Sequence, residues 1–188
     1  MMYHDQDALY QRSTPLLTFQ RNQEIISRTD SEGNILFYNK TFAKISGYSR
    51  EELFHAPHNI VRHPDMPKAV FYLIWQRLLT GIPIKTVIKN ANKEGEAYWV
   101  TLTITPQRDI HHKLISFTAQ GFLSDPNVVR MVAPLYAMVL ADEKRYSMHH
   151  AVQFLSHHLV QQGIASYNDY IHRITQKKPS GILASLGF

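Results

Sequence analysis

Residues 57–75 crowd several chemically versatile side chains into one short segment. Arg62 carries a planar set of hydrogen-bond donors that suits a phosphate, and His63 beside it can donate or accept. Phe71 and Trp75 are four residues apart, so they share one face of a helix. The segment therefore suits a binding pocket in which an anion site meets an aromatic face.

The prolines of this segment indicate where its helix begins. Pro64 and Pro67 disfavour a regular helix before the second proline, whereas Pro67 is compatible with a first helical position. Asp65 then becomes the expected N-cap of the helix that carries Phe71 and Trp75. Because the first N–H groups of a helix attract anions, this helix start would add to the anion site.

Each of these residues also has a purely structural interpretation. Arg62 and Asp65 could form a local salt bridge that fixes the turn. Phe71 and Trp75 have the spacing of ordinary core residues. Outside the segment, Asn39 has the position of a helix N-cap, and Asn90 that of a polar residue at a strand end. The residues alone leave both interpretations open.

The sequence resembles the FAD-binding PAS domains of bacterial aerotaxis receptors. The resemblance is nearly ungapped and covers roughly half to two thirds of the chain, well beyond a short motif. The residues that carry it are 57–67, Ala69, Phe71, Trp75, Leu78, Gly81, Pro83, Lys89, Asn90, Lys93, Gly95 and 98–100, and upstream Thr29, Asp30, Asn39, Thr41, Phe42, 46–48, Glu52 and Leu53.

This resemblance implies FAD as the cofactor and assigns roles within the cluster. Arg62 and His63 would serve the pyrophosphate, Phe71 and Trp75 would pack on the isoalloxazine, and the Asn90 amide would serve its imide edge. Asn39 and Asp65 match positions that are important for flavin retention in the family. His58 and Trp99 lie within the matching segments and complete the expected cofactor-binding set.

The sequence departs from the family pattern in two places. Ile84 stands where the family has a second tryptophan, and Ala91 stands where an arginine usually follows the Lys-Asn pair. Both departures remove groups that would help to hold a flavin. The chain has no cysteine, so it cannot form the cysteinyl–flavin adduct of blue-light PAS domains. A haem would need an axial ligand, and no histidine lies between Pro64 and Trp75.

Composition limits the remaining classes. The 188 residues are 44% hydrophobic and 19% charged, as in a globular protein, and no apolar run is long enough to cross a bilayer. The absence of cysteine and of a secretory signal is compatible with a cytoplasmic location. The net charge of +5 is scattered, which argues against a nucleic-acid partner. The histidines have no spacing typical of a metal site.

Periodicity and turn residues predict an α+β domain with a PAS fold, in which helices cover one face of a five-stranded antiparallel sheet. We expect an N-terminal cap over residues 1–19, the PAS domain over 20–123 and a helical extension over 124–188. Asn39 and Gly47 should bound one helix, and Ser49 with Glu52 should open the next through a capping box. Pro134 should either kink the first helix of the extension or start a second one.

These observations predict a non-catalytic redox or oxygen sensor that binds FAD and signals through its helical extension to a partner protein. No paired carboxylates, nucleophile elbow or phosphate loop indicates an enzyme. We expect a homodimer without membrane insertion, and the signalling partner is unknown. The alternative is a PAS module for protein interaction or dimerisation, whose pocket is empty or holds a small molecule; for haem, the helix of Phe71 and Trp75 offers no axial histidine.

Overall fold

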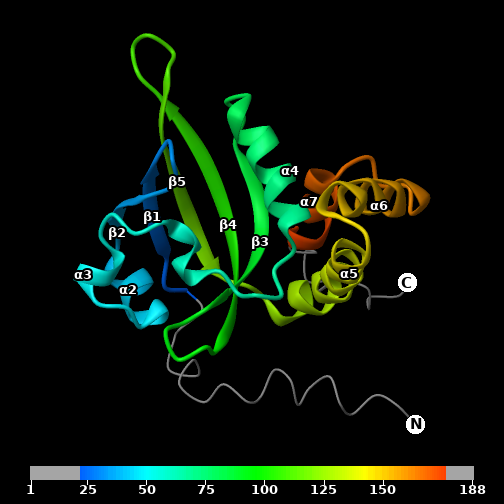
Figure 1. Cartoon of the computed structure of the whole chain (residues 1–188), viewed down its shortest axis with the longest axis horizontal. Helices are drawn as coiled ribbons and strands as arrows, with labels where there is room; N and C mark the ends of the chain where they lie inside the picture. The colour runs from blue at the N-terminus through cyan, green and yellow to red at the C-terminus, as the bar shows by residue number, and fades with distance from the viewer. Residues whose placement is uncertain (1–21, 177–188) are drawn as a thin grey trace, which may run out of the picture.

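A five-stranded antiparallel sheet and the helices around it form the architecture seen in the computed structural model, which describes residues 22–176 (Figure 1). The sheet has the order β2-β1-β5-β4-β3. The elements are β1 (Ile25–Asp30), β2 (Ile35–Tyr38), α2 (Lys40–Ser46), α3 (Arg50–Leu53), the 3-10 helix η2 (His58–Val61), α4 (Lys68–Leu79), β3 (Ile84–Ala91), β4 (Ala97–Arg108), β5 (Leu114–Leu123), α5 (Pro126–Arg145), α6 (Met148–Gln161) and α7 (Tyr167–Thr175). The predicted α+β PAS arrangement is confirmed, whereas the expected cap over residues 1–19 lies outside the described residues.

Local sequence signals explain the short helices that lead to the cavity. The Asn39 side chain accepts a hydrogen bond from the N–H of Phe42 and so caps α2, and Gly47 ends the helix with φ of 72°. Ser49 and Glu52 form the reciprocal capping box at the start of α3. These predictions are confirmed.

The start of α4 differs from the prediction. Pro67, with φ of −60° and ψ of 138°, is the N-cap residue and makes no side-chain cap, so Asp65 is not the N-cap. Instead, the Glu143 carboxylate on α5 accepts a hydrogen bond from the N–H of Ala69 at 2.9 Å. A partner 74 residues away supplies the missing acceptor, and Asp65 accepts a hydrogen bond from Lys89 instead.

The C-terminal helices pack beside α4 and along the edge strand β3 (Figure 1). α5 runs through Pro134 as one helix, and no second helix begins there. One hydrophobic cluster includes core residues of the sheet, of α4 and of α5–α7. Covering β3 with helices removes an exposed sheet edge that could pair with another chain. Among residues 22–176, no helix combines the length and the apolar character that a bilayer span requires.

Candidate functional site: a cavity between α4 and the sheet

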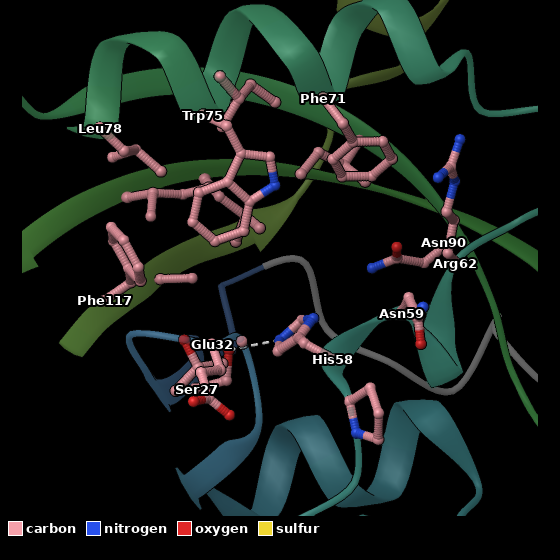
Figure 2. A pocket seen from close by; sticks show the side chains of 18 residues that line it. Ser27, Glu32, His58, Asn59, Arg62, Phe71, Trp75, Leu78, Asn90 and Phe117 are labelled. Atoms are coloured by element: carbon pink, nitrogen blue, oxygen red, sulfur yellow. Dashed lines mark hydrogen bonds between the residues drawn. The ribbon is translucent and has the colours of Figure 1, made fainter. Parts of the chain in front are cut away.

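A cavity of about 320 Å³ lies between α4, the segment around η2 and the inner face of the sheet (Figure 2). Its volume is at the small end of the range for small-molecule sites, so it suits a ring system better than a whole dinucleotide. The lining residues are Ser27, Thr29, Glu32, Gly33, Pro57, His58, Asn59, Arg62, Phe71, Ile74, Trp75, Leu78, Ile88, Asn90, Leu102, Ile104, Phe117 and Ala119.

Two aromatic side chains of α4 form one wall of the cavity. Phe71 and Trp75 both line it, as expected from their spacing of one helical turn. The Trp75 ring packs edge-on against Phe117 of β5, with 4.9 Å between centroids and 83° between planes. Trp75 remains 38% exposed, so its ring lies at an accessible part of the cavity wall.

Arg62 places a positive charge next to this aromatic wall. Its guanidinium lies 4.5 Å from the centroid of the Phe71 ring, within the range of a cation–π contact. One of its nitrogens donates to the carbonyl of Met66 at 2.7 Å, which fixes the side chain. Partial burial lowers the pKa of Arg62, and the nearby Glu143 carboxylate opposes that shift. The alternative Arg62–Asp65 salt bridge does not form among the described residues.

His58 enters the cavity lining from the start of η2. Its Nε2 lies 2.9 Å from the Ser27 hydroxyl (Figure 2). Its ring packs against that of Phe42, with 5.5 Å between the ring centroids. Burial lowers the pKa of His58 to about 4. The imidazole is therefore neutral near pH 7 and exchanges a neutral hydrogen bond with Ser27.

Asn90 brings a carboxamide to the cavity from the inner face of β3 (Figure 2). Its strand partner is Tyr98 of β4. The Tyr98 hydroxyl is buried and makes no regular hydrogen bond among the described residues. Burial raises the pKa of Tyr98, and the neighbouring Asn90 amide opposes the rise in part. Because an amide offers both donors and an acceptor, Asn90 can serve either kind of ligand atom.

The other four predicted site residues lie outside this cavity lining. The Asp65 carboxylate accepts a hydrogen bond from Lys89 at 3.2 Å, and His63 Nδ1 accepts one from the Asp65 N–H at 3.0 Å. Burial lowers the pKa of His63, and the Lys89 hydrogen bond lowers that of Asp65. Asn39 ties α2 to β1 by bonding the N–H of Ile26 and the carbonyl of Glu24.

Trp99, the last of the four, faces the helical extension. Its ring lies 6.0 Å from that of Tyr136 on α5, and its carbonyl accepts a hydrogen bond from the N–H of Ser124. In this structure Trp99 therefore joins β4 to the segment that precedes α5 and to the middle of α5, and it does not line the cavity.

Apart from Asn90, sequence reasoning missed the lining residues contributed by the strands. Ser27 and Thr29 are polar residues at buried positions of β1, whose burial alternates along the strand. The two-residue alternation of a strand can be recognised from the sequence, and polar residues at its inward positions indicate a polar cavity. Phe117 and Leu102 gave no such signal because apolar residues at inward positions are the normal core.

Two groups of contacts connect the cavity-forming elements to the helical extension. The first is the Glu143 carboxylate, which holds the first turn of α4 and lies near Arg62. The second is a buried hydroxyl network in which Tyr136 donates to the carbonyl of Val87 at 2.7 Å. Tyr167 lies 2.6 Å from Tyr136 and 2.7 Å from Thr86 in the same network. α4 and β3, which carry Trp75 and Asn90, are thus both held by the extension.

Comparisons with known proteins identify relatives of this fold and of the sequence. Residues 35–119 match the family described as PAS fold. The chain is 34% identical to the aerotaxis receptor of Escherichia coli over 139 residues, which are 74% of this chain and 27% of that protein. It is 30% identical to the nitrogen fixation regulatory protein of Klebsiella oxytoca over 47% of this chain and 19% of that protein. The chain thus spans about a quarter or less of the length of these two relatives.

Solved structures support the same fold. A light-oxygen-voltage domain, described in a study of a flavin analogue, matches 64% of this chain and 89% of its own with a TM-score of 0.52 and 19% identity. The dark structure of the blue-light photoreceptor Aureochrome1 LOV matches 64% of this chain and 84% of its own with a TM-score of 0.50 and 18% identity. Together with the sequence relatives, these matches show that the chain carries a PAS domain related to that of the aerotaxis receptor.

Proposed function

We propose that the chain is a non-catalytic redox sensor that binds FAD through its PAS domain and passes the state of the flavin to a partner protein. The observation that carries this proposal is the cavity itself, in which the aromatic wall of α4 faces the Asn90 amide and lies beside the Arg62 guanidinium. The likeness to the aerotaxis receptor supports a sensory role, and the likeness to light-oxygen-voltage domains supports a flavin.

The lining residues fit the ring of a flavin. Phe71 and Trp75 offer aromatic surface, while Asn90 offers hydrogen-bond donors and an acceptor to the polar edge of a ring. Given the small volume, the phosphates would lie outside the enclosed space, where a guanidinium such as that of Arg62 is a suitable partner. A bound flavin supplies a ring that gains or loses electrons together with protons.

Asn90 and α4 connect the cavity to the helical extension. When a ring nitrogen changes between acceptor and donor, the Asn90 amide must change its orientation to keep a hydrogen bond. Asn90 lies on β3, whose Val87 and Thr86 are bonded to tyrosines of α5 and α7. A change at the cavity would therefore alter contacts of the extension, provided the two states differ in contact energy.

The output of the sensor would be a protein contact of the extension. We propose a homodimer as the working form, and α5 exposes Met131 and Met138, seven residues apart on one helical face. Light scattering of the purified chain measures this state directly. A monomer at all concentrations would overturn the homodimer while leaving the cofactor proposal intact.

The second candidate is a PAS interaction module without a flavin, and the small cavity volume favours it. Haem has less support, because His58 is held by Ser27 and no histidine projects from α4. The test is the absorption spectrum of gently purified protein, followed by chromatography of any pigment that acid releases. A two-banded yellow spectrum with released FAD supports the sensor, whereas a protein that stays colourless after incubation with FAD overturns it.

A further inference from the structure

The tip of the hairpin between β4 and β5 carries an unusually exposed apolar side chain. Ile110 is 89% exposed, the highest value among the large apolar side chains in residues 22–176. Leu79 at the end of α4 and Ile82 before β3 are 61% and 47% exposed. Apolar side chains that gather at one exposed place commonly mark an interaction site, whereas single ones do not.

These apolar residues lie at the same end of the molecule. Arg108 connects them, because its guanidinium donates to the carbonyl of Leu79 at 3.3 Å and to the carbonyl of His112 at 2.7 Å. Gly81, with φ of 87°, leaves space for this side chain, since a Cβ there would lie 3.1 Å from the guanidinium. Figure 1 shows the hairpin between β4 and β5 and the α4–β3 connection in the upper part of the view, with the hairpin tip projecting farther.

The charges around this hairpin end are mainly positive. Arg108 and Lys113 are exposed there, and Arg77 is partly exposed. The acidic residue of the tip, Asp109, accepts hydrogen bonds from the N–H groups of His111 and Lys113, both at 2.9 Å. Asp30, the last residue of β1, pairs with Ser116 of β5 and is bonded to Asn34, and Glu32 follows in the turn after β1. The hairpin end therefore combines protruding apolar side chains with neighbouring positively charged side chains.

We propose that the hairpin end docks the domain on the surface of an anionic lipid membrane. Apolar side chains on a protruding tip suit a deformable lipid interface, and the surrounding cations suit its anionic headgroups. A protein partner would need a matching hollow to cover Ile110. The contact would be peripheral and reversible, because it needs no membrane-spanning helix. It is independent of the cofactor, since neither Ile110 nor Lys113 lines the cavity.

The test is co-sedimentation of the full chain with vesicles of phosphatidylcholine, with or without phosphatidylglycerol. The wild-type chain should bind only the anionic vesicles, and salt should weaken the binding. Ile110→Ser should reduce the partition constant at least about tenfold, because one exposed apolar side chain no longer enters the interface. Lys113→Gln should reduce it about fivefold, the effect of about 1 kcal/mol for one charge.

The matched control is Val160→Ser on α6, an apolar residue 60% exposed that lies outside the hairpin end. Its partition should equal that of the wild-type chain. Failure of the wild-type chain to bind anionic vesicles would overturn the proposal. An equal reduction of the partition constant in Val160→Ser and Ile110→Ser would also overturn it. Binding of polyglutamate in place of vesicles would also overturn it and would assign the hairpin end to an acidic protein.

Discussion

At the scale of single residues, Trp75 supplies the accessible part of the aromatic wall. Its ring is half-buried against Phe117, so truncation should remove a ligand-packing surface without leaving a large internal void. We predict that Trp75→Ala weakens FAD binding about five- to tenfold, equivalent to about 1–1.4 kcal/mol of aromatic packing. Titration of flavin fluorescence measures the affinity.

The control for this prediction is Leu79→Ala, a more exposed residue of the same helix that does not line the cavity. Its FAD affinity should match that of the wild-type chain. Unchanged affinity in Trp75→Ala would show that the flavin does not use this wall.

His58 should make the stability of the domain depend on pH. Its pKa in the folded state is about 4, below the ordinary value of 6.5, so the unfolded state binds the proton more readily between these values. The contribution of His58 to the free energy of unfolding should therefore be greatest above about pH 6.5. It should be lost as the pH decreases toward 4, a change of about 3 kcal/mol.

Substitution of His58 isolates this contribution from that of other groups. His58→Gln retains a polar amide near the Ser27 hydroxyl but does not titrate in this range. Urea unfolding at several pH values should give a shallower dependence for the variant than for the wild-type chain. If the free energy of unfolding changed equally with pH in the variant and the wild-type chain, the pH dependence could not be assigned to His58.

At the scale of elements, the start of α4 depends on α5. The Glu143 carboxylate bonds the N–H of Ala69 and interacts favourably with the helix dipole. We predict that Glu143→Ala lowers the free energy of unfolding by about 1–2 kcal/mol and speeds hydrogen exchange in the first turn of α4. Lys144→Ala, at the exposed neighbouring position, is the control. Equal exchange in both variants would show that Glu143 does not hold α4.

The tyrosine network should stabilise the contact of α5 and α7 with β3. Because Tyr136 donates its single hydroxyl hydrogen to Val87, the simplest chain of donors runs from Thr86 to Tyr167 to Tyr136. Tyr136→Phe would leave the buried Val87 carbonyl without this donor, which should lower the free energy of unfolding by about 1–3 kcal/mol. Chemical denaturation measures the change.

Tyr146→Phe is the matched control for the network, because Tyr146 is exposed at the end of α5. It should leave stability within about 0.5 kcal/mol of the wild-type value. A Tyr136→Phe variant as stable as this control would contradict the role of the buried hydroxyl.

The elements themselves were largely predictable, because their signals are local. Asn39, Gly47 and the Ser49–Glu52 box specify helix ends through contacts within a few residues. The capping of α4 was not predictable, since its acceptor, Glu143, comes from a distant part of the chain. The same limit applies to Asp65, whose lysine partner on β3 is also distant in sequence.

At the scale of the whole molecule, the cavity is where predicted and unpredicted residues meet. Arg62, Phe71 and Trp75 could be proposed from side-chain type, spacing and family resemblance, and the structure places them around one cavity. Trp99 could not be separated from them by sequence, because its contact with Tyr136 depends on how α5 folds back on the sheet. Long-range packing, rather than residue type, thus decides which side chains line the site.

The most direct test of signalling from the cavity to the extension is hydrogen exchange of the FAD-loaded chain, oxidised and chemically reduced. We expect altered protection in β3, the first turn of α4 and the adjoining parts of α5 and α7. α2, which is held locally by Asn39, should serve as the unchanged internal reference. Identical exchange in β3 and α5 in the two redox states would contradict transmission through the helical extension.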